Sequence, residues 1–107
     1  MKFEFDHFGV PVKEKREGMI HFPDYKVWCS DYGKDPYRIE RIFFEEGCEM
    51  HALIQSIPHV CFLVKDIYVA VRGKKILLEP VYYQGYYMAF IEDDGVPVEF
   101  LQCCHSS

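Results

Sequence analysis

The chain has 107 residues, of which 50% are hydrophobic and 17% aromatic, so we expect one domain (residues 1–107) with a single core. Its formal charge of -5 is spread along the chain without a basic cluster, which argues against nucleic acid as a partner. No apolar stretch approaches the roughly 20 residues of a membrane span, and acidic residues stand where a signal peptide has its apolar region. We therefore expect a soluble cytoplasmic protein without a membrane partner.

The cysteines are an odd set without a Cys-x-x-Cys pair: Cys29, Cys48, Cys61, Cys103 and Cys104. This pattern suggests neither a disulfide framework nor a zinc site with sulfur ligands. We expect reduced cysteines that mostly fill apolar space.

Seven segments alternate apolar and polar residues and are rich in Val, Ile, Phe and Tyr, which predicts strands over residues 3–12, 25–32, 37–46, 57–64, 75–80, 86–92 and 96–102. Tight turns are expected at residues 33–36 and at Asp94-Gly95. The one predicted helix covers residues 65–73, where Asp66 can cap its start and Gly73 can end it. Residues 13–19, at the matching place in the first half, have almost no apolar face.

The two halves of the chain repeat one pattern. The segment that begins at His7 aligns with the segment that begins at His59, because both place apolar residues on one strand face and end in a lysine and an acid. Two later segments, 39–42 and 98–101, share the order apolar, Glu, any residue, apolar. The sequence therefore predicts two related modules, about 1–48 and about 57–102, with a linker at about 49–56.

Each predicted module contributes one histidine and one glutamate: His7 and Glu40 from the first, His59 and Glu99 from the second. Imidazole and carboxylate donors together suit a divalent ion such as Zn, Ni, Co, Mn or Fe(II). Such an ion can bind adjacent substrate oxygens or lower the pKa of a bound water. The alternative is that both histidines are buried strand residues and both glutamates are solvated.

These segments resemble the vicinal oxygen chelate superfamily, which includes glyoxalase I, methylmalonyl-CoA epimerase, extradiol dioxygenases and bleomycin-binding proteins. The resemblance rests on residues 5–10, 39–42, 58–66 and 88–102. It implies an α+β fold in which two βαβββ modules form a cupped mixed sheet around a metal. It places the ligands at His7, Glu40, His59 and Glu99, with His51 as the alternative to Glu40 if residues 50–55 form the last strand of module one.

The first module departs from this pattern because its helix is shortened or absent. A homodimer is one way to cover the exposed sheet, so we expect one.

The resemblance implies a metal-dependent lyase or isomerase of glyoxalase or epimerase type. Its substrate is expected to be a small molecule with neighbouring oxygens, and Glu40 or Glu99 is the expected base. One alternative is a metal-free protein that binds a small ligand, in which Tyr82 and Tyr86 are candidates to line the pocket. A second alternative is an Fe(II) oxygenase that uses His7, His59 and Glu99.

Overall fold

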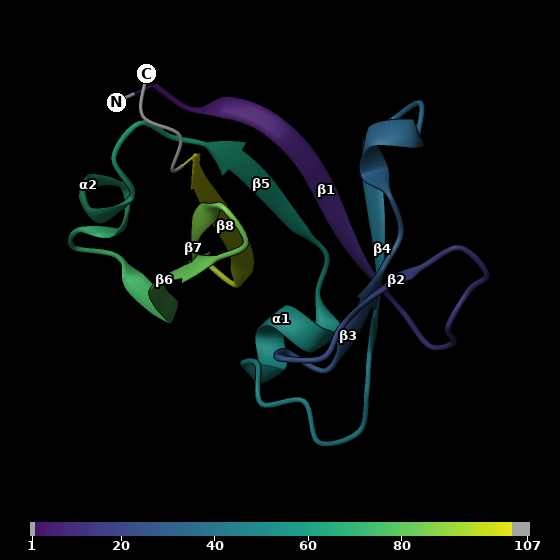
Figure 1. The fold of residues 1–107 in the computed structure, drawn as a ribbon. Coiled ribbons are helices and arrows are strands. Elements are labelled where there is room, and N and C mark those ends of the chain that lie inside the picture. Colours follow the sequence, from purple (N-terminus) through teal and green to yellow (C-terminus); the bar gives the residue numbers. More distant parts are fainter. Residues whose placement is uncertain (1, 104–107) are drawn as a thin grey trace.

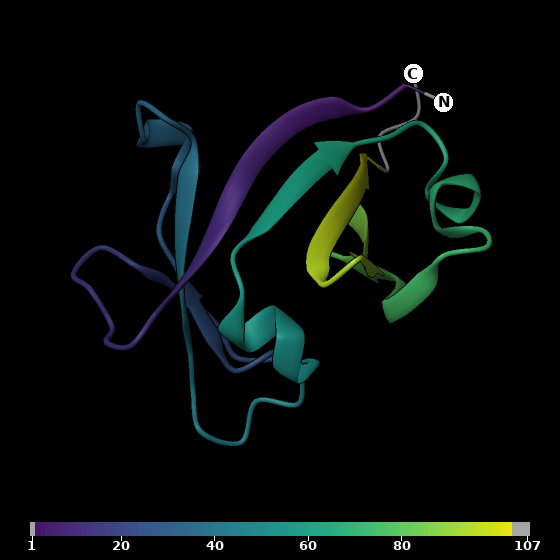
Figure 2. The ribbon, with the colours of Figure 1, turned by 180° about the vertical axis from the view of Figure 1, so that it is seen from behind.

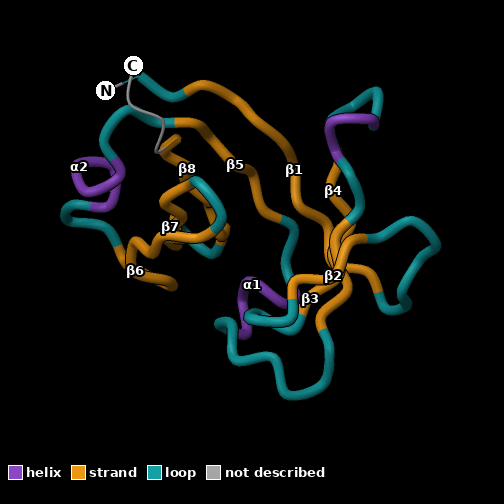
Figure 3. Tube along the Cα trace, viewed as in Figure 1, coloured by secondary structure: helices purple, strands orange, loops and turns teal. Residues whose placement is uncertain are grey.

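The computed structural model describes residues 2–103, so Cys104 lies outside the described residues. Eight strands dominate this part of the chain, with three short helical segments between them (Figures 1 and 3). In chain order the elements are β1 (Glu4–Val12), β2 (Ile20–Phe22), β3 (Val27–Cys29), η1 (Tyr32–Lys34), β4 (Ile39–Phe44), α1 (Ala52–Ser56), β5 (His59–Leu63), α2 (Ile67–Val71), β6 (Lys75–Tyr83), β7 (Tyr86–Asp93) and β8 (Val96–Cys103). The predicted α+β fold is confirmed.

All eight strands belong to one mixed sheet, in the order β2-β3-β4-β1-β5-β8-β7-β6. The sheet curls into a cup, with β1 and β5 side by side at its centre in both views (Figures 1 and 2). The central pair is antiparallel, while β4 runs parallel to β1 and β8 runs parallel to β5. The two edges of the cup are β2 and β6.

The register of the central pair agrees with the internal repeat. Phe8 lies opposite Val60, and the flanking pairs are His7 with Cys61 and Gly9 with His59. The repeat aligns residues 7–9 with residues 59–61. If the two halves of the chain were exchanged, the same three residue pairs would therefore form. The sheet therefore has an approximate twofold axis between Phe8 and Val60, and the two-module layout is consistent with it.

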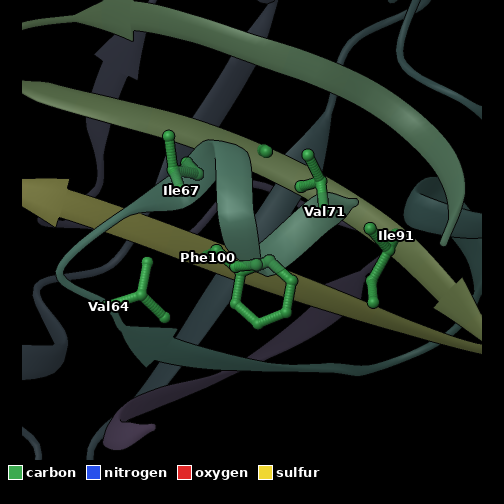
Figure 4. Close-up of a cluster of buried hydrophobic side chains, with 7 residues drawn as sticks. Val64, Ile67, Val71, Ile91 and Phe100 are labelled. Carbon is green, nitrogen blue, oxygen red and sulfur yellow. The ribbon is translucent and has the colours of Figure 1, made fainter. Parts of the chain in front are cut away.

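Helix α2 covers the outer face of the second module. Its apolar side packs on β7 and β8 in a buried cluster (Figure 4) made of Val64, Ile67, Ala70, Val71, Ala89, Ile91 and Phe100. The Asp66 carboxylate caps the helix by accepting from the backbone N–H groups of Tyr68 and Val69. The predicted helix is thus confirmed, and so is the hairpin at Asp94 and Gly95, whose φ angles are both positive, 49° and 88°.

In the first module no helix lies between β1 and β2, as expected. Residues 13–19 form a loop instead, and from it the Lys15 ammonium lies 4.3 Å from the centre of the Trp28 ring. The His21 ring stacks on the same indole at 4.2 Å. The chain thus covers part of this sheet face itself, and the homodimer stays a prediction.

Besides η1, two elements were not predicted. The first is β2, a three-residue edge strand, and the second is α1, which lies within the expected linker. Both are too short to show a hydrophobic period. Helix α1 depends on local contacts: His51 Nδ1 caps it by accepting from the Leu53 N–H at 3.0 Å, and Ile54 is buried.

The predicted strand over residues 25–32 is only partly correct, because β3 ends at Cys29 and η1 begins at Tyr32. Within residues 2–103, no helix is long and apolar enough to cross a membrane. The four cysteines in this range are free, as expected, but only Cys29 and Cys61 are buried.

The α2 cluster gives a test of the packing. Ile67→Ala should lower the free energy of unfolding by about 2–4 kcal/mol, because Ile67 is fully buried and its truncation leaves a cavity. Val69→Ala on the same helix is the control, since Val69 is 40% exposed, and should change stability by less than about 1 kcal/mol. Urea denaturation measures both. Equal losses in the two variants would contradict this packing.

Candidate metal centre and pocket

Four side chains converge on the concave face of the sheet, one from each of the four middle strands. They are His7 on β1, Glu40 on β4, His59 on β5 and Glu99 on β8. His7 Nε2 lies 3.4 Å from Glu99 Oε1 and 3.5 Å from Glu40 Oε1. His59 Nε2 lies 3.0 Å from the same Glu99 oxygen. The structure therefore brings together all four residues of the duplicated pattern.

The pairing register explains this convergence. Glu40 lies opposite Gly9, and Glu99 lies opposite Cys61, so each glutamate pairs with the residue two places after its histidine. Residues two apart on a strand share a face. Each module thus directs its histidine and its glutamate to the same side of the sheet.

The cluster is buried, and its charges depend on one another. His7, His59 and Glu99 are 2%, 3% and 7% exposed. Burial opposes protonation of His7, but the carboxylates of Glu40 and Glu99 outweigh it and raise the pKa of His7 to about 10. Burial likewise opposes ionisation of Glu99, but His59 and His7 outweigh it and lower the pKa of Glu99 to about 2.

The donor set fits a divalent cation. His7 Nε2 is buried without a hydrogen-bond partner, and it faces the two carboxylates. The ligand atoms of His7, His59 and Glu99 all lie within 4.8 Å of one another, close enough to share one ion. Two nitrogen and two oxygen donors match the preferences of hard and borderline divalent metals.

Asp6 supports His7 from the side away from the other donors. The Asp6 carboxylate accepts from His7 Nδ1 at 2.7 Å, which leaves Nε2 directed at the site. The Arg38 guanidinium in turn contacts the Asp6 carboxylate at 3.4 Å and donates to the Asp6 carbonyl. His59 has no such support, because its Nδ1 is buried without a partner and Pro58 stands where the first module has Asp6.

Asp6 was missed at the sequence level because neighbours in a regular strand point to opposite faces. A β-bulge removes that constraint. Phe5 lies opposite Phe62 and His7 lies opposite Cys61, so Asp6 is the extra residue. As a result Asp6 and His7 are both buried. The sequence feature that could have indicated the role of Asp6 is the presence of an acidic residue directly before the histidine.

Tyr32 was also missed. It lies in η1, and its ring stacks on the His7 imidazole at 4.1 Å. Burial, and then the Asp6 carboxylate, raise the pKa of the Tyr32 phenol. The phenol therefore stays neutral and shields one face of His7 from water.

A pocket of about 150 Å³ opens beside these donors. Its polar end is formed by Glu40, His59 and Glu99, and its walls are Phe22, Tyr25, Val27, Cys29, Ile42, Phe44, Met50, Ile54, Tyr83, Met88 and Phe90. His51 does not approach the donor cluster, since its ring caps α1 and is exposed. The four convergent donors thus include Glu40 and not His51.

Tyr82 and Tyr86 do not line this pocket. They are 57% and 40% exposed, and Tyr83 lines it instead. Two register irregularities interrupt β6 before this point, between Ile76 and Leu78 and between Leu78 and Val81. Each irregularity can change which side chains of β6 face the pocket. Simple alternation along the strand therefore does not predict the face on which a given tyrosine lies.

This geometry defines a class of protein. Two related modules form one curled mixed sheet, and a buried His/Glu cluster lies in its concave face. No protein-family model matches the chain, and no curated protein matches its sequence. The hypothetical protein BH1468 from Bacillus halodurans C-125 has a similar structure, with a TM-score of 0.65 and 20% identity over 100% of this chain and 99% of that one.

Methylmalonyl-CoA epimerase from Mycobacterium tuberculosis is also similar, with a TM-score of 0.59 and 15% identity over 94% of this chain and 87% of that one. At these identities the likeness shows a shared fold. The fold that the sequence resemblance implied is therefore present, in a form whose first module has no helix between β1 and β2.

Gly9 tests the packing of the site. A Cβ at this position would lie 2.0 Å from Cε1 of His59, so Gly9→Ala must displace that ring. We expect it to lower the free energy of unfolding by about 1–3 kcal/mol. Gly33→Ala is the control, because a Cβ there meets only the Asp31 side chain, at 3.1 Å. Urea denaturation and the His59 imidazole NMR signals give the readout, and unchanged values for Gly9→Ala would contradict the close contact.

The His7 pKa predicts how stability depends on pH in the metal-free protein. Because folding raises this pKa from 6.5 to about 10, protonated His7 stabilises the fold fully below pH 6.5, and that contribution is lost as the pH rises towards about 10. Thermal melts in EDTA should therefore show falling stability across this range, with a smaller fall for His7→Gln. Parallel profiles, or an NMR titration of wild-type His7 near pH 6.5, would contradict the expectation.

Proposed function

We propose that this protein is a metal-dependent isomerase or lyase of glyoxalase or epimerase type that acts on a small molecule with two neighbouring oxygens. The observation that carries the proposal is the convergence of His7, Glu40, His59 and Glu99 from equivalent positions in two related modules. The fold shared with a methylmalonyl-CoA epimerase supports it.

The residues that would hold the ion are the two histidines, through Nε2, and the carboxylates of Glu99 and Glu40. A divalent ion bound there would polarise two adjacent substrate oxygens as a Lewis acid. Asp6 keeps His7 in the tautomer that offers a lone pair at Nε2. Because a protonated imidazole cannot be a ligand, metal must displace the proton of His7, and binding should weaken as the pH falls.

Glu40 is the better placed of the two glutamates to move a proton. Its side chain is 18% exposed, lines the pocket, and has one ionic contact, to His7 at 3.5 Å. Glu99 contacts both histidines, and these contacts lower its pKa to about 2, which makes it a poor base. In the proposed isomerisation a Glu40 carboxylate oxygen takes the proton from the hydroxyl-bearing substrate carbon next to a carbonyl and delivers it to that carbonyl carbon, while the hydroxyl proton moves to the former carbonyl oxygen.

A second candidate function rests on the tightest donor group. His7, His59 and Glu99 lie within 4.8 Å of one another, and Glu40 is not part of that group. Two histidines and one carboxylate are the ligand set of non-haem Fe(II) oxygenases. Anaerobic reconstitution with Fe(II), followed by measurement of oxygen uptake, distinguishes this function from the first.

The metal site is tested by elemental analysis of protein expressed with mixed divalent metals, followed by competition against a chromogenic chelator. We expect about one ion per chain, and Glu99→Gln should weaken binding at least about tenfold, since even indirect supports of a metal are worth that much. Glu45→Gln is the matched control, because Glu45 is partly exposed and pairs with His21 outside the site.

Absence of a bound divalent ion, together with equal thermal stability of wild type and Glu99→Gln when metal is added, would overturn the proposal. Ligand-induced thermal shifts that persist unchanged in EDTA would instead support a metal-free binding protein.

A further inference from the structure

The pocket beside the donor cluster has an unusual distribution of charge. Its fourteen lining residues include two carboxylic acids, Glu40 and Glu99, and one histidine, His59, but no lysine or arginine. The nearby arginines already have partners elsewhere, Arg38 at Asp6 and Arg41 at Asp35. A ligand in this pocket therefore meets no lysine or arginine among the residues that line it.

The rest of the wall is apolar and comes from both modules. Val27 and Phe44 contribute from the first module, Met88 and Phe90 from the second, and Ile54 from α1 between them. An anionic group on the tail of a ligand would have to leave water and lie against this wall without a partner. Burial of an unpaired charge is strongly unfavourable.

Three aromatic rings of the pocket wall meet one another. The Tyr83 ring, at the end of β6, meets the Tyr25 ring at 4.9 Å and the Phe22 ring at 6.2 Å, both edge-on. These contacts join the two edges of the cup, because Phe22 ends β2. The volume of about 150 Å³ is below the range of about 300–1,000 Å³ typical for drug-sized ligands. The tail that enters is therefore small as well as uncharged.

We propose that the site selects a small substrate that carries its chelating oxygens at one end and an uncharged, apolar tail at the other, and that it rejects substrates whose tail carries a carboxylate, phosphate or sulfonate. This inference rests on the proposed function, since the metal would bind the oxygen end. The inference concerns the apolar wall of the pocket, however, so it can be right or wrong whether or not a metal ion binds.

A matched pair of hydroxamic acids tests the inference. Hexanohydroxamic acid and adipic acid monohydroxamate have the same chelating group and a chain of the same length, and they differ only by a terminal methyl or carboxylate. Each is titrated into protein labelled at the methionine methyl groups with carbon-13, with and without Zn(II). Met50 and Met88 line the pocket and report binding, while Met19 lies outside it and serves as the internal control.

We expect both probes to shift the Met50 and Met88 signals and leave Met19 unchanged, with adipic acid monohydroxamate binding at least about tenfold more weakly at pH 7. Acetohydroxamic acid, which lacks the tail, should also bind more weakly than hexanohydroxamic acid. Equal affinities for the matched pair, tighter binding of the carboxylate, or no shift of Met50 and Met88 with either probe would overturn the inference. A preference for the apolar tail that persists while Zn(II) fails to bind would support this inference and overturn the proposed function instead.

Discussion

The antiparallel pairing of β1 with β5 is the constraint on which the rest of the structure depends. It places Phe8 opposite Val60 and brings two copies of one strand pattern face to face. The parallel partners β4 and β8 then add a glutamate on each side. A slip of one residue in this central pair would place the two histidines on opposite faces of the sheet, because side chains alternate along a strand. The register therefore specifies the site as well as the fold.

Assembly of this site withdraws polar groups from water, so its stability depends on how they pair. Two imidazoles and two carboxylates are withdrawn from water, and such groups are unfavourable in an interior unless they pair. In the metal-free protein they pair with one another, through His7 to both glutamates and His59 to Glu99. The apolar cluster under α2 stabilises the second module, and a smaller buried cluster of Val27, Cys29 and Ile42 stabilises the first.

The sequence was informative where a long-range pattern was present in duplicate. The repeated His and Glu segments predicted the two modules, and the structure brings those four residues together. The missing first helix followed from the absence of an apolar face over residues 13–19. Short elements such as α1 gave no periodic signal, and Asp6 was hidden because a bulge changes the direction of a side chain without leaving a mark in the pattern. Register irregularities in β6 likewise prevented the sequence from predicting which of its neighbouring tyrosines faces the pocket.

The difference between the two glutamates has a stereochemical consequence for the proposed reaction. Glu40 and Glu99 come from β4 and β8, on opposite sides of the central strands, so they flank a bound molecule from different directions. Glu99 is held by two histidines, whereas Glu40 has a single longer contact. A symmetric frame thus presents one carboxylate with a single contact and one with two, and with Glu40 as the single base of the proposed isomerisation the proton would leave one carbon and reach its neighbour on the same face of the substrate.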